Sequence, residues 1–189
     1  HAQYPAADKV LYELAWAQKS LGDQSGAVAS FAALAEKHPN SPLAAEANFH
    51  RAEDRYAAKE YAKAVEVYGL ALSSASDAGL QQKVLHKLGW TYYQMAQYPQ
   101  AMEQFDRQLK VSAEGPLAAD ASFLRGECLF KSGEHEKALA VFLGTDRAGL
   151  SSPQMAVLLQ LHAGQAAGQL GKWDQSLELL DAFVQSHPD

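Results

Sequence analysis

The sequence of 189 residues contains no isoleucine, and threonine occurs only at Thr91 and Thr145. Strands favour β-branched and aromatic side chains, so this scarcity argues against a β-sheet. Alanine, leucine, glutamine, glutamate and lysine, which helices favour, dominate instead. Apolar residues make up 48% of the chain and charged residues 20%, which excludes intrinsic disorder. We therefore expect an all-α fold.

Cysteine and basic clusters are also scarce. The single cysteine, Cys128, excludes an internal disulfide and a cysteine-based zinc site, and we expect it to be a buried, inert thiol. No run of lysine and arginine is present and the net charge is -6, which argues against nucleic-acid binding. The seven histidines do not cluster at the spacing of metal ligands. We expect no metal and no cofactor.

Catalytic and membrane-spanning patterns are absent from the sequence as well. It contains no Gly-rich phosphate loop, no G-x-S-x-G elbow and no H-E-x-x-H motif, so we expect no catalytic residues and no enzyme activity. The longest uncharged stretch, 148–171, includes Pro153, His162 and several glutamines, which would be costly in a bilayer. We expect this stretch to be a buried helix rather than a membrane insertion.

What the sequence does contain is a repeat. Pro5, Pro42, Pro116 and Pro153 all fall on one 37-residue step, and Gly79 occupies the remaining place. Self-similarity at such a period is the sequence signature of a repeat architecture. We expect a single array with repeats at about 5–41, 42–78, 79–115, 116–152 and 153–189.

Three columns of residues recur in register within these repeats. A small residue is followed four positions later by a large apolar one, and a second small residue stands twelve positions before the first. Small residues let two helices approach closely, and the large residue fills the remaining gap. The columns are Ala15, Ala52, Gly89, Gly126 and Gly164; Ala27, Ala64, Ala101, Ala138 and Ser176; Phe31, Tyr68, Phe105, Phe142 and Leu180.

This pattern predicts two helices per repeat, A and B, joined by a bend. The bends are expected near Gly22, Lys59, Ala96, Gly133 and Gly171, where the glycines suit left-handed helix caps. Ser-Pro pairs at 41–42 and 152–153 predict capped starts of A helices, because proline is favoured at the first helical position. The B helices are predicted at 23–37, 60–74, 97–110, from 134 to 141 and beyond, and 173–185.

The columns resemble the signature of the tetratricopeptide repeat (TPR): a small residue in helix A, another early in helix B and a large apolar residue four positions on. The resemblance extends over essentially the whole chain, and repeats two and five diverge most. It implies a right-handed α-solenoid of five helical hairpins. Proteins of this family hold other proteins, so the resemblance implies a protein or peptide partner.

A finer resemblance lies in the linker 38–47, whose sequence is His-Pro-Asn-Ser-Pro-Leu-Ala-Ala-Glu-Ala. It is similar to repeat junctions in bacterial envelope proteins, namely the Tol-Pal system coordinator and the outer-membrane assembly lipoproteins. His187 and Pro188 repeat the beginning of that junction. The likeness implies a setting in the bacterial cell envelope, with the periplasm favoured over the cytoplasm.

The family also implies which positions of the A helices line the concave groove. They lie three residues before, one after and four after the small residue of helix A. The predicted partner-binding residues are Tyr12, Trp16, Phe49, Glu53, Tyr56, His86, Trp90, Tyr93, Phe123, Glu127 and Phe130. Lys19, Leu161, Gln165 and Gly168 complete the set. We expect Trp16, Trp90 and Tyr93 to be partly exposed, although aromatic residues at helical spacing also serve packing. Glu53 and Glu127 could equally be solvated charges.

Two functions are therefore predicted. The first is a scaffold that binds a peptide or helical segment of a partner in the groove. The alternative is a structural assembly module that packs end to end in a longer solenoid or oligomer, with self-association through the C-terminal hairpin. For that alternative we expect Leu177, Leu180 and Val184 to be partly uncovered. The chain begins at His1 without a methionine, and we expect it to be a piece of a longer protein.

Overall fold

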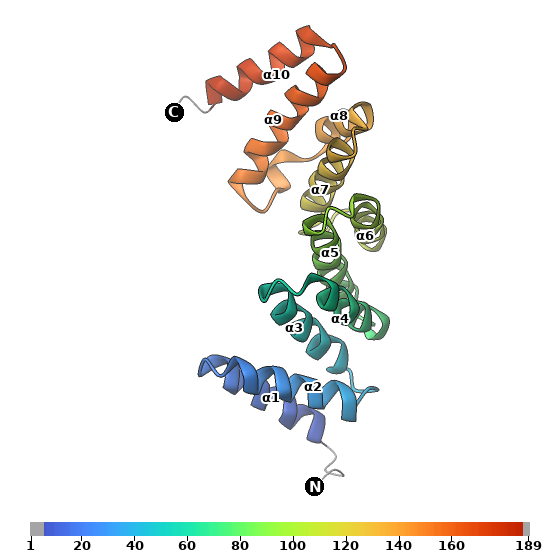
Figure 1. Ribbon diagram of the computed structural model, residues 1–189, viewed down its shortest axis with the longest axis vertical. Helices are drawn as coiled ribbons and strands as arrows, with labels where there is room; N and C mark the ends of the chain where they lie inside the picture. The colour runs from blue at the N-terminus through green and yellow to red at the C-terminus, as the bar shows by residue number, and fades with distance from the viewer. Residues whose placement is uncertain (1–5, 187–189) are drawn as a thin grey trace. The chain divides into compact units, whose positions relative to one another are not determined.

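The computed structural model describes residues 6–186, and these form helices with no strand, as the composition predicted (Figure 1). Among these residues, no helix combines the length and apolar character that crossing a membrane requires. The A helices are α1 (Ala7–Ser20), α3 (Ala44–Ala57), α5 (Ala78–Gln94), α7 (Ala118–Lys131) and α9 (Pro153–Gln169). The B helices are α2 (Gln24–Lys37), α4 (Tyr61–Ser74), α6 (Tyr98–Val111), α8 (His135–Gly144) and α10 (Trp173–Ser186), and a short 3₁₀ helix, η1 (Arg147–Gly149), precedes α9.

Contacts divide the chain into two units, with the division inside α5: unit 1 ends at Thr91 and unit 2 begins at Tyr92. In unit 1, α1 pairs with α2 and α3 with α4, and α2 packs on α3. In unit 2, α7 pairs with α8 and α9 with α10, while α6 packs on α7 and α8 on α9. The first two hairpins thus pack on each other in unit 1, and the last two pack on each other in unit 2. The repeat boundaries given above stay a prediction.

The bends between A and B helices are confirmed at all five predicted positions. Gly22, Lys59, Ala96, Gly133 and Gly171 have φ angles of 80°, 59°, 56°, 79° and 70°. At each bend the positive-φ residue donates its N–H to the carbonyl three residues back, and the next residue donates to the carbonyl five back. The bonds Gly22 to Lys19 (3.1 Å) and Asp23 to Gln18 (2.9 Å) illustrate the pair. This is the Schellman motif, which satisfies the last carbonyls of the A helix.

The helix starts match the sequence prediction in one place and not in another. Ser152 caps α9 as predicted: its hydroxyl accepts the N–H of Met155, and Pro153 is the first helical residue. The predicted start at Ser41-Pro42 is wrong, because α3 begins only at Ala44. Ser41 Oγ accepts the N–H of Leu43 at 3.1 Å and so closes a turn before the helix. Pro116 also lies in a turn, and α7 begins only after it, at Ala118. Pro5 lies outside the described residues.

The small and large columns meet in the core as predicted. Phe31, Tyr68, Phe105 and Phe142 are each 0–2% exposed. Contact between the helices is close: a Cβ placed on Gly126 would lie 2.5 Å from Phe142 Cε1, and one on Gly164 would lie 2.7 Å from Leu180 Cδ2. In these hairpins the helices pack at a distance that excludes even alanine without adjustment of the facing side chain.

Candidate A-helix face

The residues that the TPR register places in the groove are called here the A-helix face. Trp16, Trp90 and Tyr93 are partly exposed, as predicted. The same holds for Tyr12, Phe49, Glu53, Tyr56, His86 and Phe130. Two positions differ from the expectation of an open surface: Phe123 is 3% exposed and Glu127 is 5% exposed. α7 lies against both α8 and α9, and these helices cover the two side chains.

Where the first hairpin of unit 1 meets α3, aromatic rings of α1 and α2 surround His50 of α3. The Trp16 and His50 rings meet edge to face with centroids 4.8 Å apart, and His50 stacks on Phe31 at 5.1 Å. Lys19 Nζ lies 5.2 Å from the centroid of the Trp16 ring. Burial lowers the pKa of His50, since removal from water disfavours the charged imidazolium, and Lys19 acts in the same direction.

Glu53 forms the centre of the next part of unit 1. Tyr68, from the core of α4, donates its hydroxyl to Glu53 Oε1. Lys87 of α5 pairs with Glu53 Oε2 at 2.9 Å, and its Nζ lies 6.0 Å from the centroid of the Tyr56 ring. Burial and the neighbouring carboxylate raise the pKa of Tyr68, so its hydroxyl stays protonated as a donor. Glu53 is therefore a fixed acceptor and not a freely solvated charge.

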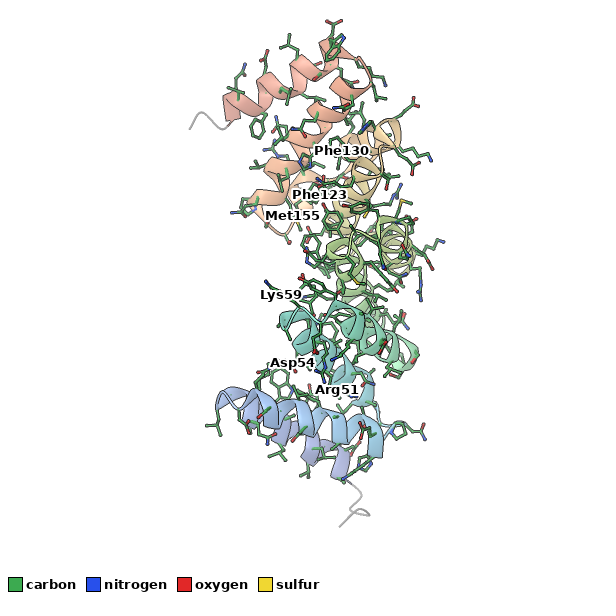
Figure 2. The ribbon with its side chains drawn as sticks, in the orientation of Figure 1. Arg51, Asp54, Lys59, Phe123, Phe130 and Met155 are labelled. Atoms are coloured by element: carbon green, nitrogen blue, oxygen red, sulfur yellow. The ribbon has the colours of Figure 1, made fainter. Side chains whose placement is uncertain are left out.

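Unit 2 repeats this arrangement around Glu127. His162 Nδ1 of α9 lies 2.5 Å from Glu127 Oε1, and Tyr93 donates its hydroxyl to Oε2 at 3.5 Å. The His162 ring stacks on Phe130 with centroids 5.5 Å apart and an interplanar angle of 3°. Figure 2 shows Phe130 on α7, at the side of that helix next to α9. Burial, and next the charge of Glu127, raise the pKa of Tyr93.

The two clusters are related by the repeat. Glu127 follows Glu53 by 74 residues, or two repeats, and Phe130 follows Tyr56 by the same interval. Each glutamate pairs with a base two positions before the small residue of the next A helix, Lys87 or His162. We call these contacts the glutamate–base pairs. Sequence reasoning missed both bases, although their constant offset from Gly89 and Gly164 carried the signal.

Unit 2 also contains an open cleft with a volume of about 890 Å³. Three positions assigned to the face from sequence, Phe130, Gln165 and Gly168, line it. Trp173, the first residue of α10, is 71% exposed and forms another part of the lining. Large aromatic surfaces beside polar groups are typical of protein-binding sites.

Cys128 of α7 stands next to Glu127 of the A-helix face. Cys128 is buried, as predicted, and burial raises the pKa of its thiol to about 12, which leaves it an unreactive thiol at neutral pH. Within residues 6–186, no three His, Cys, Asp or Glu side chains are grouped so that they could hold a metal ion.

Comparison with known families identifies the repeat. A tetratricopeptide-repeat model matches residues 86–153, and a second model with the same description matches residues 9–41 and 159–189. No curated protein sequence matches the chain.

Solved structures show the same fold. MamA aligns with a TM-score of 0.77 and 15% identity over 96% of this chain and 92% of its own. YrrB, described as a TPR protein with an unusual peptide-binding site, aligns with a TM-score of 0.75 and 20% identity over 95% and 86%. A tetratricopeptide repeat protein from Parabacteroides merdae aligns with a TM-score of 0.76 and 19% identity over 96% and 67%. At these identities the likeness establishes the fold alone.

Proposed function

Because the chain carries tetratricopeptide repeats along most of its length, we propose that it is a non-catalytic scaffold whose A-helix face binds a segment of a partner protein. The TPR fold is typical of protein-interaction scaffolds. The finer part of the proposal, that binding occurs on the A-helix face, is supported chiefly by the cleft of unit 2. Phe130, Gln165 and Gly168 line that cleft.

The lining of this cleft has the composition that recognition of a protein segment needs. Trp173 offers a large, exposed apolar surface, and Gln165 beside it is an exposed polar side chain that both donates and accepts. Phe130 is held in place by its stack on His162, which Glu127 in turn orients. A rigid aromatic anchor loses little conformational entropy when a partner binds, so its burial contributes to affinity.

Random peptides displayed on phage, selected on the full chain, provide the test. We expect Trp173→Ala to weaken the selected peptides at least about tenfold, since aromatic anchors at hot spots contribute about 2 kcal/mol or more. Gln165→Ala is expected to weaken them less. Both side chains are exposed, so neither variant removes core packing.

The matched control is Leu143→Ala on α8 of the same unit, because Leu143 is also an exposed apolar residue, at 53%. Binding that persists in Trp173→Ala and Gln165→Ala but falls in Leu143→Ala would place the partner elsewhere and refute the proposal. Affinity should be measured by calorimetry with synthetic copies of the selected peptides.

A second candidate function, end-to-end assembly, is favoured by α10. Leu177 and Val184 are each 61% exposed, and Leu180 is partly buried, as predicted from sequence. The corresponding apolar residues of α8, Leu139 and Phe142, are covered. Sedimentation equilibrium distinguishes the two functions: a dimer that Leu177→Glu dissociates would support assembly, and a monomer at all concentrations would exclude self-association through this face.

For the cellular setting, we propose the bacterial envelope, on the strength of the junction at 38–47 and its likeness to envelope TPR proteins. Fractionation of cells that produce the protein from its natural gene tests this. Recovery in the periplasmic fraction is expected, and recovery with cytoplasmic markers would contradict it.

A further inference from the structure

A second cleft, of about 340 Å³, lies in unit 1, and its lining contains no residue of the A-helix face. Residues of α2 and α4 form its apolar walls, including Val28, Ala32 and Val67. Arg51 and Arg55 of α3 line it as well (Figure 2 labels Arg51). It is thus an apolar slot with basic groups from a third helix, in a protein whose net charge is -6.

The basic groups of this cleft differ in their partners. Arg55 and Lys63 both bind Glu60, with N–O distances of 2.7 and 2.9 Å. Arg51 Nη1 instead donates to the neutral Asn48 Oδ1 at 2.9 Å, and no carboxylate of the described residues lies within ion-pairing distance of it. Glu66 belongs to the lining, but it forms no ion pair with Arg51. Arg51 therefore brings an uncompensated positive charge to the cleft.

The repeat shows what an arginine at this position binds. Arg125 follows Arg51 by 74 residues and holds the same place in α7. Its Nη1 pairs with Asp106 Oδ1 of α6 at 3.5 Å. The residue 74 positions before Asp106 is Ala32, which lines the cleft beside Arg51. In unit 2 the arginine thus has a carboxylate partner within the unit, Asp106, whereas unit 1 has the methyl group of Ala32 at the equivalent position.

We propose that the cleft of unit 1 binds an acidic side chain of a partner protein, whose carboxylate pairs with Arg51 as Asp106 pairs with Arg125. Val28 and Val67 would contact the apolar residues on either side of the acidic one. A carboxylate suits an arginine that lines a cleft, because the guanidinium group can donate two parallel hydrogen bonds to it. Glu66, which also lines the cleft, repels an anion and therefore lowers the affinity for the carboxylate.

The probe is the blocked peptide acetyl-Ala-Val-Glu-Val-Ala-amide, titrated into the full chain and followed by NMR at the Arg51 Nε–Hε group and the Val28 and Val67 methyl groups. We expect saturable shifts at these groups and a dissociation constant about tenfold lower than for the glutamine peptide of the same shape. A third peptide carries phosphoserine in place of the glutamate. If the chain binds the phosphoserine peptide and does not bind the glutamate peptide, the assignment of a carboxylate is wrong.

Three variants complete the test. Ala32→Asp reproduces the residue of unit 2, gives Arg51 an internal partner and should weaken the glutamate peptide about tenfold without removing a basic group. Arg51→Gln should weaken it to a similar extent. Arg125→Gln, the matched control, should leave its affinity unchanged. If the glutamate peptide binds Ala32→Asp as tightly as the unmodified chain, or does not bind the unmodified chain at all, the proposal is wrong.

Discussion

The two units of the chain contain the same cluster of residues built with different chemistry. In unit 1 the glutamate–base pair joins Glu53 to Lys87, and the two side chains are 29% and 37% exposed. In unit 2 it joins Glu127 to His162, at 6% and 16%. One pair is thus a hydrated contact of an ammonium group and the other a buried contact of an imidazole ring.

The comparison teaches that the repeat preserves geometry more strictly than chemistry. The base stands at the same offset in the A helix of both units, and an aromatic ring lies beside it, Tyr56 in one unit and Phe130 in the other. The second partner of the glutamate differs: it is Tyr68 of helix B in unit 1 and Tyr93 of an A helix in unit 2. Four sets of substitutions test which parts of this comparison matter.

The largest effect is expected at the large apolar residue of helix B, which lies in the core of each unit. Phe142→Ala should destabilise the protein by about 3–5 kcal/mol, because it removes a buried ring and leaves a cavity beneath Gly126. Tyr68→Ala in unit 1 should cost at least as much, since it also removes the donor to Glu53. Urea denaturation measures both, and Leu143→Ala, at an exposed site of α8, should change stability by less than about 0.5 kcal/mol. A cost below about 1 kcal/mol for Phe142→Ala would mean that the column is not a core.

The next effect concerns the glutamate–base pairs, whose coupling energies are measured by double-mutant cycles in urea. The substitutions are Glu53→Gln, Lys87→Gln, Glu127→Gln and His162→Gln. For Glu127 with His162 we expect a coupling of about 2 kcal/mol, because the pair is buried and little screened by water. For Glu53 with Lys87 we expect about 0.5 kcal/mol, since exposed pairs contribute little. Equal coupling energies in the two units would refute the distinction.

A smaller effect on stability is expected from the residue type at equivalent bends. Lys59 and Gly133 occupy equivalent places and both have positive φ, which costs a residue with a Cβ about 1 kcal/mol. Lys59→Gly should therefore stabilise unit 1 by about 1 kcal/mol, and Gly133→Ala should destabilise unit 2 by a similar amount. A Cβ on Gly133 meets no atom within 4 Å, so the second change reports backbone strain and not a clash. Thermal denaturation would contradict this account if both variants shifted the midpoint in the same direction.

The smallest expected effect is on the pH dependence of the protein's stability. The pKa of His50 is lowered by burial, so the folded state favours the neutral ring. This contribution is complete above the ordinary pKa of histidine, about 6.5, and is lost as the pH falls through the folded-state value, because the unfolded state then binds more protons. In His50→Leu, which reproduces Leu124 of unit 2, stability should change less between pH 7 and 5. An unchanged slope of the urea midpoint with pH would show that His50 does not contribute.

The helices and bends could be predicted from sequence because each depends on local chemistry. The bend at Ala96 was found by spacing alone, although alanine gives no turn signal. The start of α3 was misplaced because a proline also suits the turn that precedes a helix, and local sequence does not distinguish the two. The glutamate–base pairs could not be predicted, since Glu127 and His162 are 35 residues apart and meet only when two A helices pack. The burial of Phe123 and Glu127 has the same origin.

The five bends are closed by main-chain hydrogen bonds, and they require only a residue that can adopt a positive φ. The two helices of a hairpin can therefore change their outward-facing residues without any change in the bend that joins them. Natural variation and protein engineering can then alter the helix surfaces that meet partners, while the pairing of helices A and B stays as it is.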